Sequence, residues 1–446
     1  MMKRSFLVSV AVLVSVAVSA QTKQWTLQEC IDYAMQNSIT LQRARLQQQS
    51  AQEDVKGSKA ALLPSLSAST NQSVGYRPWQ DAGVATVTNG TVNAKVDKTY
   101  YNGSYGVNAQ WTVWNGGRNL NQVKLNKLTA EQAELEAQET ANDIQERIAQ
   151  LYVQILYSAE AIQVNKESLE TARKNAERGQ TMVNVGKMSR ADLAQLTAQQ
   201  AQDEYAVVES ESALRNYKRQ LKELLQIVNN EEFDVVIPET TDQMALETIP
   251  QLAAVYAEAL NHRPEIRNAQ LGIEASDISI KMAKASRLPS VGLSAAAGTN
   301  TVSMSDNAWS KQMKTNFDVS AGVTVSVPIF DNRQSKTAIN KAQLQKENYL
   351  LDLQNQQTTL YSTIENYWLQ ATTNQSKFIA ARESTRSAQE SYNLLSEQFR
   401  MGLKNIIELM NGKDLLLQAQ QAELQSKYLT ILNIDMLQFY QTGQLK

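Results

Sequence analysis

A long internal repeat limits what this chain can fold into more than any other feature of its sequence. Residues 60–65 read Ala-Ala-Leu-Leu-Pro-Ser, and residues 285–290 read Ala-Ser-Arg-Leu-Pro-Ser. A glycine turn at Gly186 returns at Gly402, and each is followed by an acid and a leucine. Proline and glycine motifs that recur in the same order over so long a period indicate two similar structural units. Each unit is predicted to be a helix, a pair of strands and a very long helical hairpin.

Residues 1–20 are predicted to be a secretory signal. Lys3 and Arg4 precede a short apolar run at 6–18, and small residues follow before Gln21. The apolar run is too short to cross a bilayer comfortably, which disfavours a transmembrane anchor. We therefore expect an exported mature chain that begins near Gln21.

The chain has one cysteine, Cys30, and one histidine, His262. A disulfide within the chain is therefore excluded, and a zinc or copper cluster or a catalytic histidine triad lacks its usual residues. We expect Cys30 to be a small packed residue, and we expect no metal and no other cofactor. With 43 basic and 45 acidic residues the charge is nearly balanced, so nothing suggests a nucleic-acid partner.

Two tracts without proline are predicted to form long helical hairpins. None of the seven prolines lies between Pro78 and Pro238 or after Pro328. Proline inside a helix costs about 3 kcal/mol, so its absence permits long helices. We place the hairpins at 118–228 and 333–440, with their turns at glycines, which tolerate the left-handed geometry of a helix end.

These features divide the mature chain into a first repeat at 21–228, an insert at 229–262 and a second repeat at 263–446. Along the first hairpin, apolar residues recur every seven positions, which keeps one seam facing a partner helix. The opposite face is polar, so the helices suit a hollow arrangement as well as an ordinary elongated coiled coil. The seam consists of Ile148, Ile155, Ile162, Leu169 and Ala176 on one arm and Leu193, Val207, Leu214, Leu221 and Val228 on the other.

Four segments, at about 65–77, 100–114, 290–302 and 316–328, are predicted to be strands. The second and the fourth alternate apolar and polar residues over about ten positions or more, as strands of outer-membrane barrels do. The alternative is a soluble sheet whose apolar side covers a core. The helices are too long and too polar to cover such a sheet, so we predict a mainly α fold with transmembrane β-strands.

Four strands cannot close into a pore. Membrane barrels begin at about eight strands, and an open edge in lipid leaves backbone groups unpaired. The chain should therefore assemble with copies of itself. Two copies would give eight strands and three would give twelve; a twelve-stranded barrel better matches a wide tube of helices.

At this point the chain resembles the TolC family of outer-membrane efflux channels, over about residues 25–443. The features that carry the resemblance are the duplication, the Leu-Pro-Ser motifs at Pro64 and Pro289, the NHRPEI segment at 261–266, and the tips at Gly186 and Gly402. The resemblance implies a homotrimer with a twelve-stranded barrel in the outer membrane of a Gram-negative bacterium. It also implies an α-helical barrel through the periplasm and a belt that includes the insert, with a short strand at 233–237. The implied partners are outer-membrane lipid, a periplasmic adaptor protein and an inner-membrane pump.

In this family, inward-coiled hairpins close the periplasmic end, held by charged links and rings of acid. The resemblance places Asp192 at the acid of the first hairpin and Glu408 at the first acid of the second. Lys404, Phe399 and Asn411 stand where the type member has an arginine, a tyrosine and a second aspartate. The missing hydroxyl and the missing charge imply a gate that is held differently here, with the second hairpin as its site.

A structural role competes with the gating role of both acids. Asp192 and Glu408 each occupy the third position of a capping box, where a carboxylate satisfies free N–H groups and the helix dipole. The two roles are compatible in one assembly. If Glu408 lines the lumen, copies of it would form a ring that attracts cations.

The exposed hairpin tips are candidates for contact with the adaptor, because apolar residues at a turn have little core to join. The alternative is that they pack against other hairpins of the trimer. The candidate tip residues are Val185, Gly186, Met188, Met401, Gly402 and Leu403.

The sequence therefore predicts a passive exit duct of a tripartite efflux or type I secretion system. It favours no enzyme, since no glycine-rich phosphate loop follows a strand and no nucleophile motif occurs. The alternative is a periplasmic coiled-coil structural or adaptor protein without a membrane barrel, which leaves the four alternating strands unexplained. The sequence does not name the cargo.

Overall fold

The computed structural model describes residues 24–79, 85–87, 90–92, 98–228, 233–237, 242–305 and 307–445. The expected secretory signal lies outside the described residues, as do parts of the insert. In the described part of the chain, no helix is both long enough and apolar enough to cross a membrane.

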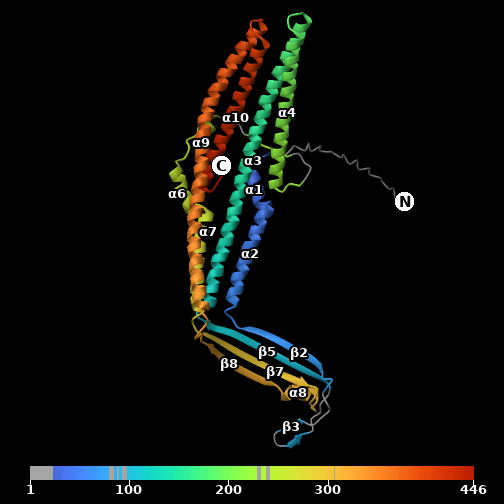
Figure 1. Ribbon diagram of the computed structural model, residues 1–446, viewed down its shortest axis with the longest axis vertical. Coiled ribbons are helices and arrows are strands. Elements are labelled where there is room, and N and C mark those ends of the chain that lie inside the picture. The colour runs from blue at the N-terminus through green and yellow to red at the C-terminus, as the bar shows by residue number, and fades with distance from the viewer. Residues whose placement is uncertain are drawn as a thin grey trace, which may run out of the picture. The chain divides into compact units, whose positions relative to one another are not determined.

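Long helices and a small number of strands make up the fold (Figure 1). The helices are α1 (Leu27–Asn37), α2 (Ile39–Ala60), α3 (Arg118–Asn184), α4 (Arg190–Leu224), α5 (Asp242–Ala245), α6 (Leu252–His262), α7 (Pro264–Ala285), α8 (Trp309–Thr315), α9 (Gln334–Arg400) and α10 (Ile406–Thr442). The strands are β1 (Gln24–Trp25), β2 (Ser65–Tyr76), β3 (Ala85–Val87), β4 (Gly90–Val92), β5 (Thr99–Asn115), β6 (Asp234–Val235), β7 (Ser290–Val302) and β8 (Asp318–Ser326).

The chain forms two compact units, and neither of them is one of the sequence repeats. The sheet unit combines Thr40–Thr140 with Leu260–Tyr361. The hairpin unit combines the chain up to Ile39 with Ala141–Ala259 and Ser362–Lys446. Each unit therefore takes segments from both repeats, so neither repeat is a compact unit by itself.

The sheet unit contains a four-stranded antiparallel sheet in the order β2-β5-β7-β8 (Figure 1). The pairs β2–β5 and β7–β8 are the strand pairs expected within each repeat. The pair β5–β7 joins the two repeats along a register that runs from Asn102↔Val302 to Asn115↔Ser290, with one irregularity between Thr112 and Trp114.

The register sorts side chains onto an apolar and a polar face of the sheet. One row across the four strands is Ala68, Val107, Ala297 and Val319. The neighbouring row is Ser67, Asn108, Ala296 and Ser320. Successive side chains of a strand point to opposite faces, so the alternation in the sequence becomes one apolar and one largely polar surface. The apolar row stays largely exposed: Val107 and Val319 are among the exposed large side chains.

In the hairpin unit the expected heptad seam is largely buried. Ile148 and Ile155 are fully buried on α3, and Leu221 is fully buried on α4. The expectation for Val228 is wrong, because that side chain is 97% exposed. Helix α4 ends at Leu224 and Gln226 has a positive φ, so the chain leaves the helix before the last heptad position.

A short two-stranded parallel pair, β1 with β6, belongs to the hairpin unit. The hydroxyl of Tyr152 on α3 donates to the carbonyl oxygen of Val236 at 2.6 Å and ties this pair to the long helix. The strand expected at 233–237 is β6, which covers only Asp234–Val235. Cys30 on α1 is fully buried, so its expected role as a small packed residue is confirmed.

Candidate gate at the hairpin tips

The two hairpin tips share one backbone turn. Gly186 and Gly402 have φ values of 72° and 75°, the left-handed conformation that glycine adopts at low cost. At the first tip the N–H of Lys187 donates to the carbonyl of Met182 at 2.8 Å. At the second tip the N–H of Leu403 reaches back over the same number of residues, at 2.9 Å. Both helices thus end in a Schellman motif, which satisfies their last carbonyl groups.

The return helices begin differently. Asn405 and Glu408 form a complete capping box at the start of α10, with N–H to side-chain distances of 2.9 and 3.3 Å. At the start of α4 the Ser189 hydroxyl oxygen accepts from the N–H of Asp192 at 3.0 Å. Among the described residues, the reciprocal hydrogen bond from the Ser189 N–H to the Asp192 side chain is not formed, so the capping box of α4 is incomplete. The capping role is therefore fully realised only for Glu408.

Lys404 is paired with Glu408 within the same tip. Its Nζ atom lies 2.6 Å from Glu408 Oε1. The hydrogen bond from Lys404, followed by that from the Asn405 N–H, holds the pKa of the Glu408 carboxyl below its usual range. Asn411 is exposed one turn further along α10, and Asp192 is half-buried.

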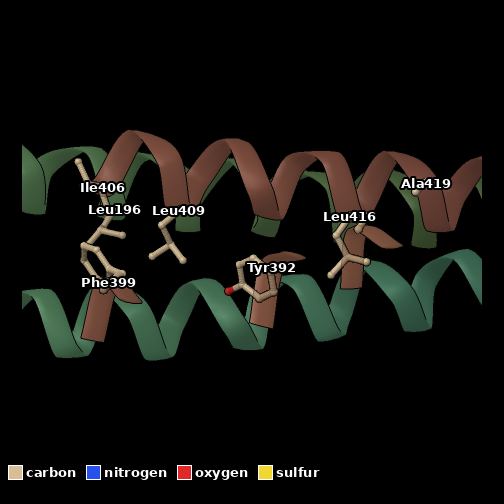
Figure 2. Packing of buried hydrophobic residues seen from close by; sticks show 9 residues of the cluster. Leu196, Tyr392, Phe399, Ile406, Leu409, Leu416 and Ala419 are labelled. Atoms are coloured by element: carbon tan, nitrogen blue, oxygen red, sulfur yellow. The ribbon is translucent and has the colours of Figure 1, made fainter. Parts of the chain in front are cut away.

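Phe399 lies in a different environment from these polar residues. It is buried in an apolar cluster that takes residues from all four hairpin helices. Figure 2 shows Phe399 with Leu196 and Ile406 at one end of this cluster and Leu416 with Ala419 at the other. The tip cluster consists of Ala176, Leu196, Ala388, Tyr392, Phe399, Ile406, Leu409, Leu416 and Ala419.

The tip residues divide between surface and core. Val185 and Met401 are each 63% exposed and Leu403 is 70% exposed, so these three are accessible to a partner in a single chain. Met188 instead packs against the tip cluster.

The sequence did not predict one buried ion pair, which joins the two hairpins. Lys413 of α10 binds Asp203 of α4, and their side chains are only 6% and 4% exposed. Asp203 also accepts from Gln199 Nε2 at 3.1 Å and from the Ser168 hydroxyl at 3.2 Å. Burial raises the pKa of the neighbouring Asp414 carboxyl, against the opposing attraction of Lys413. The sequence gives little indication of this pair, because Asp203 and Lys413 both lie in polar stretches that are typical of a solvated helix face.

Three more polar links join the first hairpin to α10. Gln421 Nε2 donates to Asn165 Oδ1 at 3.1 Å. The Tyr428 hydroxyl donates to Glu160 Oε1 at 2.7 Å, and the Tyr440 hydroxyl donates to a carboxylate oxygen of Glu146 at 3.3 Å. The other carboxylate oxygen of Glu146 accepts from Tyr367 of α9.

No group of three or more His, Cys, Asp or Glu side chains is placed to hold a metal ion within the described residues. The arrangement at the tips is one of caps, ion pairs and apolar packing, which can position helices and present charge.

The model of the outer membrane efflux protein family matches residues 30–226 and 255–434, which is most of the sequence. The chain belongs to this family. Membership confirms the expected class, a channel protein rather than an enzyme, and the location in the outer membrane with a periplasmic extension.

Individual relatives agree with this assignment. The chain is 23% identical to outer membrane efflux protein BepC of Brucella suis over 430 residues, covering 95% of this chain and 87% of BepC. It is 20% identical to outer membrane protein TolC of Escherichia coli over 358 residues, covering 74% of this chain and 72% of TolC. The crystal structure of CusC, solved in a study of transmembrane channel formation, superposes with a TM-score of 0.79 at 16% identity, covering 94% and 92% of the two chains. The predicted fold class is confirmed by that likeness.

Proposed function

We propose that the protein is the outer-membrane exit duct of a tripartite efflux or type I secretion system. In this proposal three chains form a passive channel, and a periplasmic adaptor connects it to an inner-membrane pump that supplies the energy. Three sheets would together make a twelve-stranded barrel, and the hairpins would make the periplasmic tube.

The observation that carries the proposal is the sheet with one apolar face and two open edges. Among the described residues, β2 pairs only with β5, and β8 pairs only with β7. In lipid, unpaired edge groups cost several kcal/mol each, so such a sheet is stable only when copies close it into a ring. The apolar row through Val107 and Val319 would then face lipid, and the polar row through Asn108 and Ser320 would face the lumen.

Conductance across a planar lipid bilayer tests the duct. The purified protein should insert as stable ion-conducting units without any nucleotide, and a deletion strain should become sensitive to some members of a panel of toxic compounds. A chain that remains in the soluble periplasmic fraction after carbonate extraction would favour the coiled-coil structural or adaptor protein instead.

A further inference from the structure

The short helix α8 lies at the end of the sheet that is opposite to the helices of the sheet unit. Strand β7 follows α7 and strand β8 leads toward α9, so the connection that contains α8 joins the far ends of these two strands (Figure 1). The family is located in the outer membrane with its extension in the periplasm. Helix α8 therefore lies on the side of the sheet that is toward the cell exterior.

Contacts with the sheet hold α8 against the apolar face. Tyr105 and Thr299 are register partners, and Tyr105 lies two positions from Val107 of the apolar row. Side chains two positions apart share one face of a strand, so Tyr105 and Thr299 point to the apolar side. The Thr299 hydroxyl donates to the carbonyl oxygen of Met313 at 2.9 Å. The ring of Trp309 meets the ring of Tyr105 edge-on, with their centroids 6.3 Å apart.

A buried amide side chain fixes which side of α8 faces the sheet. Gln312 is only 6% exposed. Its Oε1 atom accepts from the N–H of Val302, the last residue of β7, at 2.8 Å. Its Nε2 atom donates to the carbonyl oxygen of Asn307 at 2.8 Å. Leaving a buried amide unsatisfied is costly, so these two hydrogen bonds favour a single orientation of the helix.

That orientation turns two lysines away from the sheet. Successive residues of a helix are rotated by about 100°, so Lys311 and Lys314 lie on one side and Trp309, Gln312 and Met313 lie on the other. Both lysines are exposed. Within the part of the chain that the structure describes, neither lysine forms a hydrogen bond or an ion pair. Trp309 is 55% exposed, so its ring contacts Tyr105 and is also accessible from outside.

Negative charge is scarce around these lysines. In the four long strands and the described parts of their connections, residues 65–79, 85–87, 90–92, 98–115, 290–305 and 307–326, the one acid is Asp318. Asp318 precedes Val319 of the apolar row, so its side chain points to the polar face of the sheet. Arg77 and Lys98 add positive charge where β2 ends and β5 begins. The described residues thus leave the cations of α8 without a counter-charge on the apolar face.

We propose that Trp309, Lys311 and Lys314 form an outer patch that binds the phosphate groups of a phosphorylated glycolipid in the outer leaflet. Lysines close to a membrane surface attract anionic lipid, and a tryptophan ring sits favourably at the boundary between headgroups and acyl chains. The acyl chains of the same lipid lie along the apolar row of the sheet. An acidic soluble partner would need the lysines alone, whereas this patch is continuous with an apolar surface. The inference rests on the proposed function, because it takes that surface to be the one in contact with lipid.

Binding of defined lipids to the purified full chain tests the proposal. The protein in detergent is titrated with diphosphoryl lipid A and with the same lipid after removal of its phosphates, and native mass spectrometry counts the bound lipid. Lys311→Gln/Lys314→Gln should weaken binding of the phosphorylated lipid by about tenfold or more, since each lysine contributes to the attraction. The same variant should bind the dephosphorylated lipid as the parent does. Lys311→Arg/Lys314→Arg should keep the affinity of the parent, because the charge is retained.

Lys124→Gln/Lys127→Gln is the matched control. These two lysines are exposed, have the same spacing, and lie near the start of α3 at the other end of the sheet. This variant should bind the phosphorylated lipid within about twofold of the parent, because it leaves α8 unchanged. An equal loss in both double variants would mean that total charge matters and the outer patch does not.

Two further results would overturn the inference. One is equal affinity of the parent and Lys311→Gln/Lys314→Gln for the phosphorylated lipid, in a variant that still conducts in bilayers. The other is an equal loss for the phosphorylated and the dephosphorylated lipid, because phosphate would then not be what the lysines recognise. Failure of the parent itself to insert into bilayers and conduct would instead contradict the proposed function, and this inference with it.

Discussion

The two hairpin tips have the same backbone turn and different surroundings. Gly186 and Gly402 adopt the same left-handed conformation, and both return helices begin with a side-chain cap. At the second tip, however, Phe399 and Ile406 are buried in the shared core, and Glu408 is held by both Lys404 and its own capping box. The repeat therefore keeps the same turn in both copies, while the contacts that hold each turn in place differ.

The largest effect is expected from the buried ion pair. Lys413→Met should lower the free energy of unfolding by about 3–5 kcal/mol, because it leaves Asp203 buried without a counter-charge. The double variant Asp203→Leu/Lys413→Met should recover most of the loss. Denaturation in detergent measures both. Lys404→Met is the matched control, and it should cost far less because the Lys404–Glu408 pair is more exposed. An equal loss would mean that burial of the Asp203–Lys413 pair does not determine its contribution to stability.

Packing of the two tips can be compared at equivalent leucines. Leu409→Ala should cost about 2–5 kcal/mol, since Leu409 is 1% exposed and the change leaves a cavity. Leu193, its counterpart in the first hairpin, is only half-buried, so Leu193→Ala should cost clearly less. Denaturation in detergent measures the loss of unfolding free energy for both variants. Equal losses would show that the two tips are equally well packed.

The shared turn predicts equal effects at the two glycines. Gly186→Ala and Gly402→Ala should each cost about 1–2 kcal/mol, because alanine disfavours the left-handed conformation. The added methyl group meets no atom within 4 Å at either position, so sterics add nothing to the cost. A difference of more than about 1 kcal/mol between the two variants would mean that the turns are not equivalent in solution.

The smallest effect is electrostatic. Glu408→Gln should reduce the preference of the duct for cations in bilayer recordings, while Asp192→Asn should reduce it less. The pKa of Glu408 is lowered by Lys404, so the cation preference should persist as the pH falls below the usual carboxyl range. In Lys404→Gln that pKa rises, and the preference should be lost at a higher pH. Unchanged selectivity in Glu408→Gln would exclude a ring of this acid in the lumen.

Local sequence patterns predicted the strands and the turns, because the conformation of each depends mainly on residues close to it in the sequence. Strand alternation identified the apolar row through Val107, and glycine identified both turns, since each depends on neighbouring residues only. Val228 was wrongly predicted to be a seam residue, because heptad spacing does not indicate where a helix ends.

The contacts that hold the two hairpins together could not be predicted from such local patterns. Charged residues are rarely fully buried unless they are paired, and Asp203 lies on a different helix from Lys413. A single sequence contains no signal that brings two such distant residues together. Phe399 illustrates the same limit, because its alignment with a gating position says nothing about the core that surrounds it here.

Covalent joining of the open sheet edges tests whether three chains close their sheets into one ring. In a Cys30→Ala background, Ser320→Cys on β8 is combined in turn with Ser67→Cys, Ser69→Cys or Asn71→Cys on β2, all on the polar face. Single-cysteine variants serve as controls. With one of these pairs, oxidation in membranes should yield covalent species of two and three chains and none larger. A product that stops at two chains, or no product beyond one chain with any of the pairs, would contradict the three-chain duct.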